Sequence, residues 1–244
     1  MRVGAVNYLN TKPLIWGLEQ GMMHEAIELT IDYPARVAQR LLSGDLDIGL
    51  VPVAVMPKLA SCHLVSDYGI ACDGPVASVC LFSEVPLEQI TALYLDYQSM
   101  TSVALLKLLM REHWKIRPLL LEAGSGYEKR IGGTTAGLVI GDRAFELLGK
   151  YPFVYDLGQA WKEMTGRPFV FAAWVGTGEP DPVFKRAFNQ ACAQGLANLD
   201  AVIAENPYPH FDLREYYTRF INYKPAFDML EVITLFLNKI RMSG

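Results

Sequence analysis

Small polar side chains gather where the first strand pattern of the sequence gives way to a helix pattern. They belong to the segment Asn7-Tyr8-Leu9-Asn10-Thr11, which directly follows a short apolar run. The side-chain amide of Asn10 offers both a donor and an acceptor at a place where α/β folds present ligands. Thr11 could cap the helix that follows or contact a ligand, and capping is the commoner role of a threonine there. We therefore take Asn10 as a candidate ligand-binding residue, with capping left open for both residues.

A second junction of this kind lies where a strand pattern meets a leucine-rich helix pattern. It reads Asp96-Tyr97-Gln98-Ser99-Met100-Thr101-Ser102 and places three hydroxyl groups within four positions. Such hydroxyls, together with the N–H groups and the positive dipole end of a helix, can hold a carboxylate or a phosphate without Lys or Arg. Capping needs only one hydroxyl, so it accounts for Ser99 and leaves Thr101 and Ser102 as candidate anion ligands.

Other kinds of chemistry find little support in the sequence. The four cysteines, at 62, 72, 80 and 192, form no C-x-x-C pair, and the four histidines form no H-x-x-x-H pair, so we expect no zinc site. We interpret Cys72 and Cys80 as buried free thiols. There is no glycine-rich phosphate loop, and Ser99 lacks the G-x-S-x-G setting of a hydrolase nucleophile. Asp142, at the end of a strand pattern, could face a ligand, but capping the next helix is the simpler role.

The composition is that of a globular protein rather than of a disordered, fibrous or nucleic-acid-binding chain. Its 244 residues are 51% hydrophobic and 20% charged, and 22 basic against 26 acidic residues give a net charge of −4. The basic residues are scattered, so we expect neither a nucleic acid nor an anionic membrane as partner, while a small anion remains open. No apolar run approaches the ~18 residues that span a membrane. With an initiating Met and no signal-peptide pattern, the sequence predicts a cytoplasmic location.

Short apolar runs alternate with helix patterns, which is typical of βαβ units and a largely parallel sheet. Strands are predicted at 2–6, 28–32, 47–51, 76–82, 93–95, 119–121, 138–140, 153–155 and 169–175, with helices between them and beyond 182. The length corresponds to roughly 1.6 average domains of ~150 residues. We interpret this as two α/β lobes joined by two crossovers: residues 1–86 with 175–244, and residues 87–174. A ligand would bind in a central cleft between such lobes, at the carboxyl ends of the strands.

Six segments, spread in order over nearly the whole chain, carry a resemblance. They are VNYLNTKPL at 6–14, LLSGDLDIGLVPV at 41–53, ACDGPVASVCLFS at 71–83, LDYQSMTSVALLKLLM at 95–110, LVIGDRAF at 138–145 and DLGQAWKEMTGRPFVFAAWV at 156–175. Together they resemble the chorismate dehydratase family of the futalosine route to menaquinone. The resemblance implies the two-lobed fold of type II periplasmic binding proteins. It also implies a lyase that removes water from chorismate, a small dianion, to give 3-[(1-carboxyvinyl)oxy]benzoate, without a metal or an organic cofactor.

The resemblance also implies roles for individual residues. The family's Tyr/Phe-Leu-Asn element falls on Tyr8-Leu9-Asn10, which makes Asn10 the catalytic amide that positions the leaving hydroxyl or the enolpyruvyl group. The implied substrate-binding residues are Tyr8, Thr11, Ser78, Ser99, Thr101, Ser102 and Asp142, of which the S-x-T-S element at 99–102 would hold a carboxylate. The family usually has Arg where this chain has Met100, so one cationic contact is missing. No side chain is an obvious base, and the substrate's own enolpyruvyl carboxylate is a candidate proton acceptor.

Three alternatives remain open at this point. The related 1,4-dihydroxy-6-naphthoate synthase resembles the same fold but usually carries a His where this chain has Ile140-Gly141-Asp142. A non-catalytic protein that binds a small anion for a transporter would need a signal peptide or a lipidated Cys, neither of which the sequence indicates. The effector half of a regulator would need a DNA-binding domain. The sequence does not predict the oligomeric state.

Overall fold

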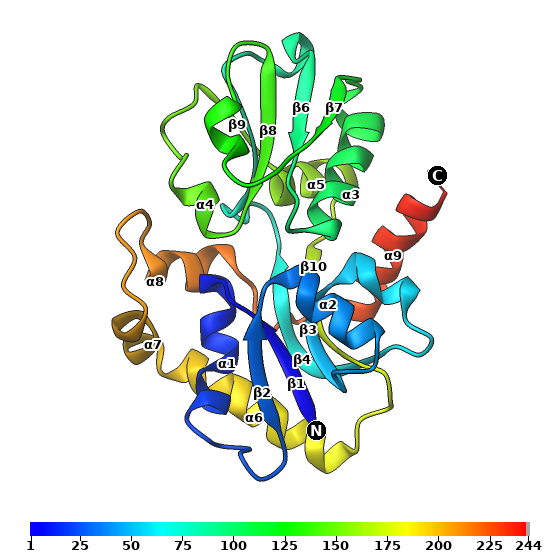
Figure 1. The fold of residues 1–244 in the computed structure, drawn as a ribbon, viewed down its shortest axis with the longest axis vertical. Coiled ribbons are helices and arrows are strands. Elements are labelled where there is room, and N and C mark those ends of the chain that lie inside the picture. The colour runs from blue at the N-terminus through cyan, green and yellow to red at the C-terminus, as the bar shows by residue number, and fades with distance from the viewer. Residues whose placement is uncertain (243–244) are drawn as a thin grey trace. The chain divides into compact units, whose positions relative to one another are not determined.

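The computed structural model describes residues 1–242 and divides the chain into two compact units (Figure 1). The first unit combines Met1–Ala71 with Val170–Ile233, and the second combines Cys72–Phe169 with residues 234–242. A five-stranded sheet forms the centre of each unit. The predicted α/β class is therefore confirmed.

The sheet of the first unit has the strand order β2-β1-β3-β10-β4. Its strands are β1 (Arg2–Val6), β2 (Glu28–Asp32), β3 (Ile48–Pro52), β4 (His63–Cys72) and β10 (Phe169–Gly176). β1 pairs in parallel with β2 and β3, while β10 runs antiparallel to β3. The helices of this unit are α1 (Lys12–Glu19), α2 (Pro34–Leu42), α6 (Pro182–Ala197), α7 (Leu199–Glu205) and α8 (Leu213–Glu215). Pro13 and Pro34 stand in the first turns of α1 and α2, where a missing N–H costs no hydrogen bond.

The sheet of the second unit has the strand order β7-β6-β8-β5-β9. Its strands are β5 (Val79–Ser83), β6 (Ala92–Leu95), β7 (Leu119–Glu122), β8 (Thr135–Ile140) and β9 (Phe153–Asp156), and its helices are α3 (Met100–Leu109), α4 (Asp142–Phe145) and α5 (Leu157–Thr165). β6 is parallel to β7 and β8, whereas β5 is antiparallel to β8 and β9. The carboxyl ends of β6, β8 and β9 and the start of β5 therefore share one edge of this sheet, and α3, α4 and α5 begin there.

Shorter helical segments and one long helix complete the described chain. Turns of 3-10 helix cover Leu9–Thr11, Val53–Lys58, Leu87–Gln89 and Tyr127–Arg130, and π-helical turns cover Met110–Trp114 and Tyr216–Phe220. The last helix, α9 (Met229–Arg241), begins in the first unit and ends in the second. Within the second unit its Phe236 packs edge-on against Phe169 and Trp161, with ring centroids 4.9 and 6.0 Å apart.

Helices α1 and α6 lie side by side in the first unit and approach each other backbone to backbone (Figure 1). Two glycines allow this contact. A Cβ at Gly17 would overlap the carbonyl oxygen of Ala191, and a Cβ at Gly195 would overlap that of Pro13. Any larger side chain at either position must therefore force the two helices apart, which fixes α1 on α6 with little freedom to slide.

The boundaries between the units differ from those that the sequence predicted. Residues 72–86 lie in the second unit rather than with 1–71, because β5 pairs there with β8 and β9. Residues 234–242 also lie in the second unit, where Phe236 contacts its aromatic core. The predicted strand at 76–82 begins only at Val79, and the strand β4 was not predicted at all.

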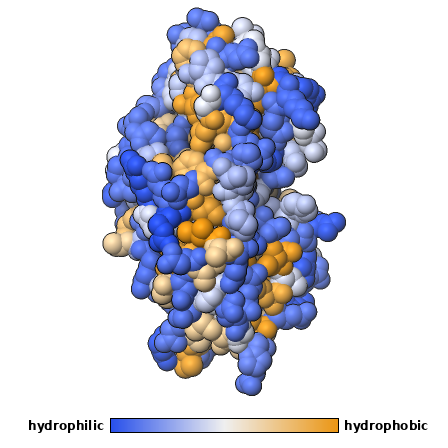
Figure 2. All heavy atoms as spheres, turned by 90° about the vertical axis from the view of Figure 1, so that its left-hand side faces the viewer, coloured by the Kyte–Doolittle hydropathy of each residue, from blue (hydrophilic) through white to orange (hydrophobic). Residues whose placement is uncertain are grey.

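The face drawn in Figure 2 is mainly hydrophilic, with apolar side chains gathered in smaller patches. Exposed apolar side chains include Tyr33 in the first unit and Leu119 in the second, at 63% and 67% exposure. Within residues 1–242, no helix combines the length and the apolar character needed to cross a membrane.

Candidate anion-binding site

The junction between β1 and α1 holds three of the predicted site residues, Tyr8, Asn10 and Thr11. Tyr8 precedes the 3-10 turn, and its carbonyl accepts a hydrogen bond from the N–H of Thr11 at 3.0 Å. Thr11 stands at the N-cap position of α1 but makes no side-chain capping bond, so the capping interpretation of its hydroxyl is wrong. The hydroxyl of Thr11, which is buried, instead donates to Oδ1 of the half-buried Asn10 at 3.4 Å.

The junction between β6 and α3 places Ser99 and Ser102 in contact. Ser99 caps α3, because its Oγ accepts a hydrogen bond from the N–H of Ser102 at 3.1 Å, and it donates to Oγ of Ser102 at 2.9 Å. Thr101 and Ser102 are buried, whereas Met100, which directly precedes them, is 45% exposed. The capping role predicted for Ser99 is therefore confirmed, and two further hydroxyls lie in the first turn of the same helix.

Ser78 and Asp142 come to the same edge of the second sheet from different strands. The carbonyl of Ser78 accepts a hydrogen bond from the N–H of Gly141 at 2.8 Å, and the next residue, Val79, pairs with Ile140. Asp142 lies in the first turn of α4, but Gly141 is the N-cap residue, so the interpretation of Asp142 as the cap is wrong. Because β8 pairs with both β5 and β6, the structure gathers five of the predicted residues at this edge: Ser78, Ser99, Thr101, Ser102 and Asp142. Tyr8, Asn10 and Thr11 belong to the other unit.

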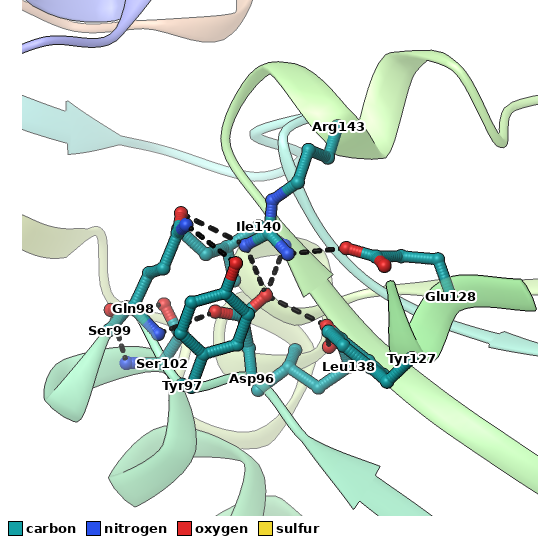
Figure 3. A network of polar contacts seen from close by, with 10 residues as sticks. All are labelled: Asp96, Tyr97, Gln98, Ser99, Ser102, Tyr127, Glu128, Leu138, Ile140 and Arg143. Atoms are coloured by element: carbon teal, nitrogen blue, oxygen red, sulfur yellow. Dashed lines mark hydrogen bonds and ion pairs between the residues drawn. The ribbon is translucent and has the colours of Figure 1, made fainter. Parts of the chain in front are cut away.

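A buried carboxylate, Asp96, stands directly after β6 and organises this edge (Figure 3). Its side chain has no exposed area. Oδ2 accepts hydrogen bonds from Arg143 at 2.6 Å, from the hydroxyl of Tyr127 at 2.8 Å and from the N–H of Ile140 at 3.3 Å. Oδ1 accepts from the N–H of Gln98 at 2.8 Å. Asp96 therefore ties the end of β6 to the end of β8 and to the loop before α3.

Arg143, in the first turn of α4, extends this network in two further directions. One terminal nitrogen donates to Glu128 at 2.5 Å, and the other, besides contacting Asp96, donates to Oε1 of Gln98 at 3.0 Å. The guanidinium carbon lies 5.2 Å from the centre of the Tyr97 ring, which is within cation–π range. A quarter of the Arg143 side chain is exposed.

The burial of this network shifts its protonation equilibria. Burial raises the pKa of Asp96, while Arg143 and the hydrogen bonds from Gln98 and Tyr127 oppose that shift. Burial lowers the pKa of Arg143, but Asp96 and Glu128 more than offset this, so the pKa of Arg143 rises overall and the guanidinium stays charged. The hydrogen bond that Arg143 donates to Asp96 therefore comes from a charged group, which makes it stronger than a bond between neutral groups.

A second carboxylate, Asp156, serves the neighbouring corner of the same edge. Its Oδ1 caps α5 by accepting the N–H groups of Gly158 and Gln159 at 2.9 and 3.0 Å. Its Oδ2 accepts the N–H groups of Val76 and Ala77 at 2.9 and 2.7 Å. Ala77 has a φ of 62°, which an alanine rarely adopts, and the N–H of residue 78 bonds back to the carbonyl of Val76 at 2.8 Å. Asp156 thus holds the strained turn that directly precedes Ser78.

The sequence did not identify four members of these networks as functional: Tyr127, Glu128, Arg143 and Asp156. For two of them, the position in the sequence could have indicated a place at this edge of the sheet. Asp156 stands at the end of a strand pattern, and Arg143 directly follows Asp142 in the first turn of a helix. Cys72 and Cys80 are free and buried, as predicted. Within residues 1–242 there is no group of three side chains suited to hold a metal ion. The chemistry that this edge can perform is the binding of a small anion by hydroxyls at the first turn of α3.

A family of proteins described as menaquinone biosynthesis matches residues 1–239 of the chain. A chorismate dehydratase of Thermus thermophilus is 32% identical over 226 residues, which cover 82% of this chain and 79% of that protein. A chorismate dehydratase of Campylobacter jejuni is 28% identical over 176 residues, covering 70% of this chain and 66% of that protein.

Three solved structures are similar in fold. A protein from Archaeoglobus fulgidus has a TM-score of 0.75 and 13% identity, with 99% of this chain and 95% of that chain covered. The periplasmic aliphatic sulphonate binding protein of Escherichia coli has a TM-score of 0.64 and 13% identity, with 99% of this chain and 90% of that chain covered. A Candida albicans protein with the generic periplasmic binding protein fold has a TM-score of 0.59 and 12% identity, with 100% of this chain and 90% of that chain covered. The periplasmic-binding-protein fold predicted from the sequence is therefore confirmed.

Proposed function

Since this chain belongs to the menaquinone biosynthesis family, we propose that it dehydrates chorismate to 3-[(1-carboxyvinyl)oxy]benzoate. The observation that carries the proposal is the 32% identity, over 82% of this chain, to a relative named chorismate dehydratase. The related naphthoate synthase and a non-catalytic anion-binding protein are less well supported. In the first case the expected His is missing from residues 140–142, and in the second the similarity to binding proteins extends to the fold alone.

The proposed reaction suits a protein with few catalytic groups. A hydroxyl group leaves the ring as water and a ring C–H proton is lost, and the ring becomes aromatic, which supplies driving force. The protein has to orient a dianion, assist one proton transfer and exclude bulk water. We assign no side chain as the base, since the substrate's own enolpyruvyl carboxylate can accept the proton. The reaction as proposed needs neither a metal nor an organic cofactor.

The proposed roles follow the two junctions. Asn10 orients the leaving hydroxyl or the enolpyruvyl group through its amide, with Tyr8 and Thr11 beside it. The hydroxyls of the first turn of α3 hold one substrate carboxylate, and Ser78 and Asp142 complete that surface. The contact of Ser99 with Ser102 supports this assignment, because it places two hydroxyl oxygens 2.9 Å apart at the start of α3, close enough for one carboxylate to contact both.

Removing two hydroxyls of the first turn of α3 is expected to weaken substrate binding. The double variant Thr101→Val, Ser102→Ala should raise KM for chorismate at least about tenfold and leave kcat within about threefold, since each hydrogen bond to a charged group contributes about 1.5–3 kcal/mol. Initial rates over a range of chorismate concentrations measure both constants. Ser83→Ala is a matched control, because Ser83 is a buried hydroxyl at the other end of β5. An unaltered KM in the double variant would mean that the anion site lies elsewhere.

The proposed function is tested directly by incubating the purified protein with chorismate. Ultraviolet absorbance and chromatography should detect the aromatic enol ether, without added metal or cofactor. Recovery of unchanged chorismate would contradict the proposal. If calorimetry then shows chorismate binding without turnover, the non-catalytic alternative replaces it.

We also propose a cytoplasmic location. The four free cysteines support it, because such thiols persist in reducing compartments.

A further inference from the structure

The proposed reaction assigns no role to Arg143, which donates several hydrogen bonds at the edge of the second sheet. Its two terminal nitrogens are occupied by Asp96, Gln98 and Glu128. Its Nε is buried and has no acceptor within residues 1–242. Arg143 therefore has few donors to offer a ligand, although it is a cation next to the proposed anion site.

Arg143 instead contacts the loop that leads into α3 (Figure 3). It donates to the side chain of Gln98 at 3.0 Å and lies under the ring of Tyr97. The amide of Gln98 in turn donates to the hydroxyl of Tyr97 at 3.1 Å. Both residues between Asp96 and Ser99 are thus held by one guanidinium, which is itself fixed by two carboxylates.

We propose that Arg143 is a positioning residue for the substrate carboxylate: it fixes Tyr97 and Gln98 and so sets the place of Ser99 and the first turn of α3. This inference rests on the proposed function for the identity of the ligand. The loop has no regular structure of its own, since β6 ends at Leu95 and α3 begins at Met100. Its conformation depends on Asp96 and Arg143, and the serine that caps α3 is the next residue along the chain.

Geometry, rather than charge, is the property that Arg143 contributes. One cation faces the two carboxylates Asp96 and Glu128, so the cluster as a whole does not attract a dianion. A lysine at this position would keep the charge but lose the planar fork that reaches Gln98 and Glu128 together. Arg143→Lys should therefore fail to restore the function lost in Arg143→Met.

The test compares Arg143→Met, Arg143→Lys and Gln98→Met with the wild type. Arg143→Met and Arg143→Lys are expected to raise KM for chorismate about tenfold, and Gln98→Met about fivefold, with kcat within about threefold. Arg2→Met is the matched control, because it breaks another arginine–aspartate pair, with Asp47 at 2.8 Å, at the amino end of β1. Its KM should stay within twofold of the wild type. A thermal unfolding curve of every variant checks that it is folded.

Hydrogen exchange supplies a readout that does not depend on turnover. The amides of residues 97–102 should exchange at least tenfold faster in Arg143→Met and Gln98→Met, and at the wild-type rate in Arg2→Met. A wild-type protein that does not convert chorismate would contradict the proposed function, and the exchange rates would still test the positioning role. An active wild type with unchanged KM in Arg143→Met and Gln98→Met, or unchanged exchange in this segment, would overturn the inference alone.

Discussion

Asn10→Ala is expected to lower kcat for chorismate dehydration about a hundred- to a thousandfold, the scale of losing a donor that stabilises charge in a transition state. The structural cost should be small. Asn10 is half-buried, it caps neither the 3-10 turn nor α1, and its one described side-chain bond is the 3.4 Å contact with Thr11. We therefore expect Tm to fall by less than about 4 °C, which corresponds to about 1 kcal/mol in a chain of this size. Steady-state kinetics and a thermal melt measure the two effects.

Asn7→Ala is the matched control, because Asn7 lies in the same junction but is exposed. Among residues 1–242, its side chain accepts a hydrogen bond only from Lys12, at 3.3 Å. Its kcat should stay within about twofold of the wild type. Undiminished turnover in Asn10→Ala would remove Asn10 from the mechanism. A large drop in Tm with proportional loss of activity would instead assign it a structural role.

Asp156→Ala is expected to destabilise the protein by about 3–5 kcal/mol. The substitution leaves four backbone N–H groups, from 76, 77, 158 and 159, without their acceptor, and each buried donor left unpaired costs about 1–3 kcal/mol. The strained turn at Ala77 also loses the carboxylate that holds it. Urea unfolding followed by circular dichroism measures the change in free energy.

Asp181→Ala is the control that separates the loss of a helix cap from the loss of the bonds that Asp156 makes to Val76 and Ala77. Asp181 caps α6 by accepting the N–H groups of Val183 and Phe184 at 2.7 and 3.1 Å, and its side chain makes no contact corresponding to that of Asp156 with the turn at 76–77. Its loss should be about 1 kcal/mol. Equal losses in Asp156→Ala and Asp181→Ala would show that the bonds to Val76 and Ala77 contribute nothing.

Much of the fold was predictable because hydrophobic periodicity is a local property. The strands 2–6 and 28–32 were predicted to the residue. β4 was missed because its sequence contains Ser66, Asp67 and Gly69, which look like turn residues. In the structure Ser66 bonds to Asn189, and Gly69 lies so close to the backbone of β10 that a Cβ would be 2.8 Å from the carbonyl oxygen of Ala172. Both reasons lie in residues more than a hundred positions away.

In the candidate site, too, contacts between residues close in sequence could be predicted and contacts between distant residues could not. Ser99 could be identified as a cap because its partner, Ser102, lies three positions along the chain. The network of Asp96 could not be predicted, because Tyr127 and Arg143 lie 31 and 47 residues from it in sequence. A single sequence carries no record of which distant residues meet. The boundaries between the units differ from the predicted ones for this reason too, since they depend on which sheet each strand joins.

The discontinuous first unit has a consequence for the order in which the chain can fold. All five strands of the second sheet lie within residues 79–156. The first sheet lacks the strand between β3 and β4 until β10 has been synthesised, and α1 must wait for α6, more than 150 residues later. Contacts of such high sequence separation form slowly, because a long loop must close before they stabilise anything. During synthesis on the ribosome, all strands of the second sheet, which precede and position α3, are therefore available early. At that stage the junction with Asn10 still lacks β10 and α6, on which its unit depends.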